Sequence, residues 1–277
     1  MGRFLAGPWE FNLFVAANLA LIMAAYTIGV RRHPRWPVRR TVAFFAGMLM
    51  LTLAYLGPVA GWSHTFFWAH MTQHLVVMMA AAPLIVYSSP ILLLSDCLTD
   101  EARERWLDPV LNSSVVRWLT NPIVSWLAFA CVLLGTHFTP FYDWALRNHD
   151  AELFIERPLF LLAALLYYLP LIGNNPLPNR PAPAVKLVSL ATMMLPEALV
   201  GGVIYFAPVL LYPTFGAPRP FGLDPLADQQ LSGAIMWALV MTIDSFWMMV
   251  VAAEWFADEE KRSEQIDAEI AAEAVGS

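Results

Sequence analysis

The sequence predicts an all-α integral membrane protein, a bundle of seven transmembrane helices. Of its 277 residues, 58% are hydrophobic and only 14% are charged, whereas a soluble domain carries about 25% charged residues. The apolar residues also form long blocks, and about 20 residues rising 1.5 Å each cross the hydrocarbon core of a bilayer. Several such blocks in one chain predict a polytopic membrane protein.

Seven apolar segments follow one another along the chain, and the fifth is short. Their expected ranges are 11–30, 42–61, 74–94, 123–138, 158–173, 187–206 and 231–253. Prolines interrupt the third segment, at Pro83 and Pro90, and the sixth. A membrane helix tolerates proline when neighbouring helices satisfy the freed carbonyl groups. Residues 1–257 are expected to form the membrane domain, and residues 258–277 an acidic cytoplasmic tail that is either a solvated helix or disordered.

Basic residues in the loops predict the orientation, because Lys and Arg gather on the cytoplasmic side. The first loop, residues 31–40, holds five arginines. Placing this loop inside leaves twelve basic residues inside and four outside, namely Arg3, Arg147, Arg157 and Arg219. The amino terminus is then expected outside the membrane and the carboxyl terminus in the cytoplasm.

This orientation brings most histidines to the outer face. His70 and His74 cap the third segment and lie four residues apart, so they share a helix face and can chelate one ion. His137 ends the fourth segment at a similar depth and is the third candidate ligand. Asp228, which opens the seventh segment at that level, and His149 are candidate accessory residues. Imidazole suits copper, zinc, iron or nickel; alternatively, these histidines only form hydrogen bonds at the membrane interface.

Two acids lie within predicted membrane segments. Glu197 is midway along the sixth and Asp244 is in the inner half of the seventh. Acids at such depth cost free energy and mark candidate functional sites, although a protonated acid can simply bond to a neighbouring helix. Met193 and Met194 lie one turn from Glu197, and thioethers suit Cu(I). Methionines also fill apolar cores, so these residues are candidates for a polar or metal path, or for core packing.

Motifs of soluble enzymes are missing from the sequence. It contains no phosphate-binding glycine loop, no GxSxG and no HExxH, so we expect no enzyme and no nucleic-acid partner. The two cysteines, Cys97 and Cys131, belong to different segments, and a disulfide framework is not expected.

Four stretches of segments three to seven together resemble a known family. They are HMTQHLVVMMAAAPLIV from His70, THFTPFYDWALRNH from Thr136, FLLAALLYYLPLIGNNPLPNRPAP from Phe160 and LADQQLSGAIMW from Leu226. In this order they resemble the CtaG-like family of cytochrome c oxidase assembly factors, named from the caa3-type oxidase. The resemblance implies a seven-helix bundle in the bacterial plasma (inner) membrane and a role in maturing the oxidase, thought to be copper delivery.

The resemblance also implies a ligand set, because His70, His74 and His137 match the family's motif histidines. Other positions depart from it. Where many members have histidines entering segment five, this chain reads ELFIERPLF, with Leu153 and Arg157, and where some have a histidine in segment six it has Glu197. These departures indicate either a leaner metal site or a paralogue that has lost metal binding.

The expected function is therefore a non-catalytic assembly factor that binds copper, its expected cofactor, at the outer face. Its expected partners are cytochrome c oxidase subunits or other copper chaperones, together with the lipid bilayer. One alternative is a transporter of copper or another small solute, in which Glu197, Asp244 and the methionines form a polar path. Another is a structural subunit of a respiratory complex that holds no metal.

Overall fold

The computed structural model describes residues 8–218 and 221–276, with side chains as far as residue 266. Every regular element in these residues is a helix, so the predicted all-α class is confirmed. Two of the outer basic residues used for the orientation, Arg3 and Arg219, lie outside the described residues, as do the side chains at the end of the predicted tail.

Five helical rods are long and apolar enough to cross a membrane. They are α2 (Leu13–Arg32), Val38–Ser63, Phe67–Cys97, α15 (Pro183–Phe206) and the apolar part of α16 (Pro225–Gly276). The second rod joins α3 (Val38–Leu56) to α4 (Pro58–Ser63). The third rod comprises α5 (Phe67–Leu75), η1 (Val76–Ala81), α6 (Ala82–Tyr87) and α7 (Pro90–Cys97). The chain is thus an all-helical membrane protein.

The fourth and fifth predicted segments form shorter helices. The fourth is α11 (Pro122–His137), which is apolar but has 16 residues. The fifth is α14 (Arg157–Tyr168), which continues directly from α13 (His149–Ala151) and η3 (Glu152–Glu156). The total of seven spans and the orientation therefore stay predictions. The remaining short elements are α8 (Asp100–Ala102), η2 (Arg103–Leu107), α9 (Asp108–Leu111), α10 (Ser114–Leu119), α12 (Phe141–Leu146) and η4 (Pro213–Gly216).

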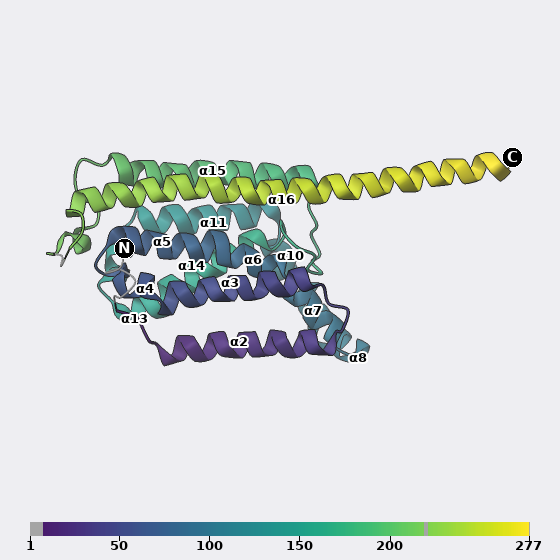
Figure 1. The fold of residues 1–277 in the computed structure, drawn as a ribbon, viewed down its shortest axis with the longest axis horizontal. Helices are drawn as coiled ribbons and strands as arrows, with labels where there is room; N and C mark the ends of the chain where they lie inside the picture. The colour runs from purple at the N-terminus through teal and green to yellow at the C-terminus, as the bar shows by residue number, and fades with distance from the viewer. Residues whose placement is uncertain (1–7, 219–220, 277) are drawn as a thin grey trace.

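The rods run roughly parallel to one long axis (Figure 1). Helices α15 and α16 lie side by side along one edge and α2 lies along the opposite edge, with α5, α11 and α14 between them. The short helices α4 and α13 lie at one end of the bundle, whereas α7, α8 and α10 lie at the other. Helix α16 continues beyond that second end, so the predicted seventh span and most of the predicted tail form one helix.

Several helices accommodate a proline by widening locally just before it. Each of the three π-helical stretches in the described chain ends two residues before a proline: η1 before Pro83, η2 before Pro109 and η3 before Pro158. Proline lacks an N–H and its ring collides with the carbonyl group four residues earlier, which a turn with i→i+5 hydrogen bonds can relieve. The helices therefore pass through these prolines instead of ending at them.

A neighbouring helix also satisfies the carbonyl group that Pro83 frees. The Trp247 indole of α16 donates to the Met79 carbonyl, four residues before Pro83, at 3.1 Å. At Pro90 the rod instead begins a new helix, α7, and the Val86 carbonyl before it accepts from the Ser89 nitrogen at 2.9 Å and from the Asn175 side-chain amide at 3.2 Å. For Pro83, the sequence-based expectation about proline is confirmed.

Two glycines bring α15 and α16 into backbone contact. A Cβ atom added at Gly233 would lie 2.5 Å from the Tyr205 nitrogen and 2.6 Å from the Gly201 carbonyl oxygen. Only glycine fits between backbones this close. The close crossing holds the buried acid of α15, Glu197, beside the buried acid of α16, Asp244.

Candidate functional site

The helix that carries His70 and His74 is capped by a residue from the far end of the sequence. Helix α5 begins at Phe67 without a side-chain cap of its own. Asp228, fully buried near the start of α16, accepts hydrogen bonds from the backbone nitrogens of Phe67 at 2.7 Å and Trp68 at 3.1 Å. A carboxylate suits the positive end of a helix. Asp228, predicted as an accessory metal-path residue, thus positions the histidine helix.

His70 and His74 converge with a carboxylate that the sequence analysis did not select. Their Nε2 atoms lie 2.5 Å apart. The Oε1 atom of Glu156, in η3, lies 3.4 Å from Nε2 of His70 and 3.3 Å from Nε2 of His74. All three side chains are buried, with 0%, 6% and 0% exposure for His70, His74 and Glu156. We call these three residues the buried triad.

The buried triad has the donor set and nearly the spacing of a metal site. Ligands about 2.0–2.1 Å from an ion in tetrahedral geometry lie roughly 3.3 Å from one another. The two oxygen–nitrogen distances, 3.3 and 3.4 Å, match that spacing. The two imidazole nitrogens, at 2.5 Å, would have to separate to admit an ion between them. Two imidazoles and one carboxylate suit copper or zinc.

The charge of Glu156 also requires a cationic partner. Apart from the two imidazoles, neither oxygen of its carboxylate meets a hydrogen-bond donor among the described residues. The Nδ1 atom of His70 is likewise buried with no partner there. A buried carboxylate is costly unless a cation or several donors compensate it. A protonated imidazole or a bound metal ion would each supply that positive charge.

His137 lies beside the buried triad but does not belong to it. Its Nδ1 atom is 2.8 Å from the Leu133 carbonyl oxygen, and its Nε2 atom is buried without a partner in the described chain. The Tyr142 ring lies close to both histidine rings, with centroids 5.3 Å from His137 and 5.2 Å from His70. The three predicted histidines are therefore neighbours, but only the pair on α5 shares a close ligand group.

A small cavity connects this region to the acid of the sixth segment. Its volume is about 20 Å³, room for roughly one water-sized species. Its wall includes His74, His137 and Glu197. Four methionines, which have polarizable side chains, also line the cavity: Met71, Met78, Met79 and Met236. The methionines predicted near Glu197 do not line this cavity; Met193 is buried in the core and Met194 is half-buried.

Glu197 and Asp244 form a buried carboxyl pair. A hydrogen bond joins the two side chains, and the Tyr168 hydroxyl donates to Oδ1 of Asp244 at 3.3 Å. The remaining oxygens, Oε2 of Glu197 and Oδ2 of Asp244, have no hydrogen-bond partner in the described residues. A hydrogen bond between two carboxyl groups needs a shared proton, so the pair holds at least one proton when it is formed.

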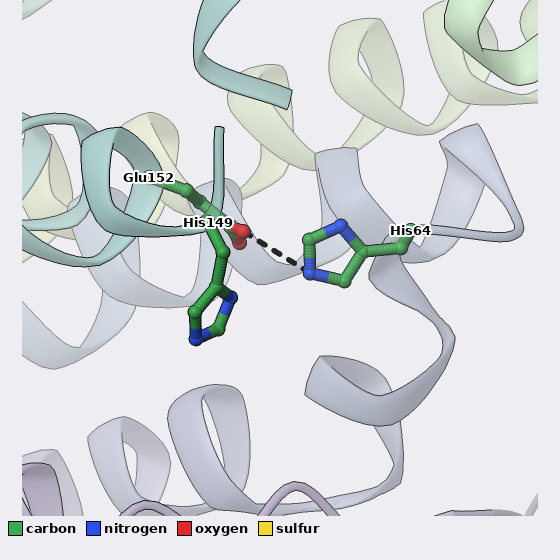
Figure 2. A group of neighbouring side chains, drawn as sticks. All are labelled: His64, His149 and Glu152. Carbon is green, nitrogen blue, oxygen red and sulfur yellow. Dashed lines mark ion pairs between the residues drawn. The ribbon is translucent and has the colours of Figure 1, made fainter. Parts of the chain in front are cut away.

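A second group gathers at the same end of the bundle, around Glu152. Figure 2 shows His64 and His149 beside this carboxylate, with Nε2 of His64 3.0 Å from Oε2 of Glu152. Arg157 donates to the other oxygen, Oε1, at 2.9 Å and also contacts Glu10 at 3.1 Å. Burial alone would raise the pKa of Glu152, but the neighbouring His64 imidazole and the positive charge of Arg157 lower the pKa to about 2. The carboxylate is therefore ionised at neutral pH.

Sequence reasoning missed Glu152 and Glu156 because it began the fifth segment at Pro158. The signal was present: the two acids are four residues apart and directly precede an apolar run, as His70 and His74 do. The departures noted in ELFIERPLF also have structural counterparts. Arg157 is the ion-pair partner of Glu152, and Leu153 is half-buried between the two acids in sequence.

Comparison with known proteins finds relatives in mycobacteria. An uncharacterized protein of Mycobacterium leprae (strain TN) is 25% identical over 262 residues, which cover 89% of this chain and 39% of that protein. One from Mycobacterium bovis is 26% identical over 275 residues, covering 94% and 41%. The chain thus spans about two fifths of the length of these curated relatives. No solved structure matches it.

The family comparison covers most of the chain and includes both histidine groups and the carboxyl pair. The model of the cytochrome c oxidase caa3 assembly factor family matches residues 24–258. The resemblance seen in the four sequence stretches is therefore confirmed, and the chain belongs to the CtaG family of caa3-type cytochrome c oxidase assembly factors.

Proposed function

We propose that this protein assists cytochrome c oxidase assembly, without catalysis, by holding copper at the buried triad of His70, His74 and Glu156. The observation that carries the proposal is the convergence of two imidazole nitrogens on one uncompensated carboxylate oxygen in the interior. The copper ion is the cargo, and its delivery would go to an oxidase subunit or to another copper chaperone at the outer face of the bacterial plasma membrane.

The surroundings of the buried triad suit a cargo ion that must later leave. Three protein ligands leave a coordination position open for an acceptor. The neighbouring cavity, lined by four methionines and His137, offers further sulfur and nitrogen donors to an ion that leaves the triad. His137 is the histidine available for an ion displaced from the triad, because its Nε2 atom has no hydrogen-bond partner within the described chain.

Copper transport across the bilayer is a second candidate function, favoured by one observation. The cavity beside His74 and His137 also touches Glu197, which is paired with Asp244 deeper in the bundle. A transporter would use this polar series as part of a path between the two faces. A structural subunit without metal is the third candidate, in which the buried triad is held together by a proton.

The proposed orientation is tested by reporter fusions. A reporter after Ser277 is expected to be active only as a cytoplasmic fusion, and one inserted at Asn148, between α12 and α13, only as an extracytoplasmic one. The basis is the excess of Lys and Arg in the loops assigned to the cytoplasm. A cytoplasmic signal at Asn148 would place both histidine groups on the wrong side for copper delivery from outside.

Copper analysis of the oxidase tests the function itself. Because removal of either imidazole should weaken copper binding at the triad by at least about tenfold, cells that carry His70→Ala or His74→Ala are expected to accumulate oxidase deficient in copper. Because mass action offsets weakened binding, excess copper in the medium should partly restore oxidase activity. The variants should remain inserted and abundant, as judged by immunoblotting of membranes.

His33→Ala is the matched control, since His33 directly follows α2 and its ring lies 3.7 Å from Asp96, away from the buried triad. It should leave oxidase copper unchanged. Full oxidase activity in both pair variants would contradict the copper function. Lost activity with undiminished copper binding would favour the structural-subunit alternative.

A further inference from the structure

The group around Glu152 is separate from the buried triad and reaches the surface. His64 follows α4, His149 begins α13 and Glu152 lies in η3. One nitrogen or oxygen atom from each residue lies within 4.8 Å of the others. Both imidazoles are exposed, whereas the carboxylate is buried. The group therefore combines an anchored acid with two nitrogen donors that solvent can reach.

An ion pair alone does not account for this arrangement. The charge of Glu152 is already compensated by Arg157, which binds Oε1 at 2.9 Å and leaves Oε2 to face His64 at 3.0 Å. No hydrogen bond joins the His149 ring to another described residue, so direct bonding to Glu152 does not explain why this second imidazole lies beside the carboxylate. In metal sites, a partner on the far oxygen orients a ligating carboxylate, and Arg157 is placed to do so.

We propose that His64, His149 and Glu152 form a second metal site, which binds a divalent transition-metal ion from outside the membrane. Two imidazoles and one carboxylate leave further positions open to water, as in exchangeable zinc sites. Among divalent ions such ligands bind Cu²⁺ most tightly. Because the imidazoles are exposed, this site exchanges its ion with solvent, in contrast to the buried triad.

The position of the exposed site points to its use. Glu152 and Glu156 are four residues apart in η3, so their side chains lie on neighbouring turns of one helix. The exposed site thus stands next to the buried triad, with one acid of the same short stretch in each. If the proposed copper function holds, the exposed site captures the ion that the buried triad retains, and the transfer is a ligand exchange with no change of oxidation state.

Copper stoichiometry of the full-length protein in detergent tests the second site. Equilibrium dialysis against Cu²⁺ should give two bound ions for the wild type and one for His64→Ala/His149→Ala. His149→Ala alone should weaken one of the two sites at least about tenfold, and it leaves the ion pair between His64 and Glu152 intact, so folding is preserved. In the wild type, a water-soluble chelator should remove the exposed-site ion rapidly and the buried ion slowly.

The variants of the two groups separate the two proposals. If His64→Ala/His149→Ala binds as much Cu²⁺ as the wild type, with the same chelator kinetics, the exposed site does not exist. If that variant loses one ion while His70→Ala/His74→Ala loses none, the exposed site stands and the buried-triad function fails. His33→Ala should behave as the wild type in both measurements.

Discussion

Replacing Glu156 by glutamine is expected to weaken copper binding at the proposed buried site by about 10–100-fold while the protein stays folded. The change removes the negative charge of the triad and keeps the shape of the side chain. Without bound copper, the folded protein should be no less stable, because an uncharged amide costs less to bury than a carboxylate. Binding and stability should therefore move in opposite directions.

Copper titration of the purified variant and its thermal unfolding in the same detergent would measure both effects. Glu101→Gln, in α8 at the other end of the bundle, is the matched control because this side chain is exposed. It should change neither quantity. A Glu156→Gln protein that is destabilised yet binds copper normally would assign Glu156 to an ion pair with protonated imidazoles and leave the triad without a metal role.

Arg157→Met is expected to lower the free energy of unfolding by about 3–5 kcal/mol. This loss is larger than the loss of an exposed ion pair would cause. The side chain is 4% exposed and is held by Glu152 and Glu10, with its guanidinium carbon 5.5 Å from the centre of the Tyr55 ring. Its removal leaves Glu152, which is 1% exposed, with no arginine partner and only the imidazoles of His64 and His149 beside it. The measurement is the midpoint of thermal unfolding in detergent and the amount of protein in membranes.

Arg147→Met provides the comparison, because Arg147 also pairs with an acid, Asp143, but is 61% exposed. An exposed pair of this kind contributes about 0–1 kcal/mol. Adding Glu152→Gln to Arg157→Met should restore most of the lost stability, since the two changes share one interaction. Equal destabilisation by Arg147→Met and Arg157→Met, or no recovery in the double variant, would show that the buried ion pair has no special role.

The apolar blocks predicted the helices well because their length and composition directly meet the demands of a bilayer. The pairing of His70 with His74 was also predictable, since residues four apart share a helix face whatever the rest of the fold does. The third member of the buried triad, Glu156, was not predictable. Because Glu156 directly precedes Arg157 and Pro158, the sequence predicted that it lies in a loop before a helix. In the structure the chain is already helical from His149.

The sequence predicts how far along the bundle axis each residue lies. This depth alone does not determine which side chains come into contact. His137 lines the same cavity as His74, yet it is not part of the buried triad, and the Tyr142 ring lies against both His137 and His70. His149 joins His64 in a group of its own. Asp228, at the predicted level of the histidines, binds the backbone of α5 with its carboxylate. Rotation of each helix about its own axis decides these outcomes, and tertiary packing sets that rotation.

The widened turns before the prolines have a consequence for helical phase. A π-helical turn accommodates about one additional residue relative to an α-helix, and one residue corresponds to about 100° of rotation. A helical wheel drawn straight through Phe67–Cys97 would thus misplace the residues after η1 by roughly that angle relative to His70 and His74. In this rod, α5 and α6 therefore keep separate helical registers: α5 directs His70 and His74 toward Glu156, and α6 makes its own contacts independently. Deleting one residue within η1 would rotate α6 relative to α5.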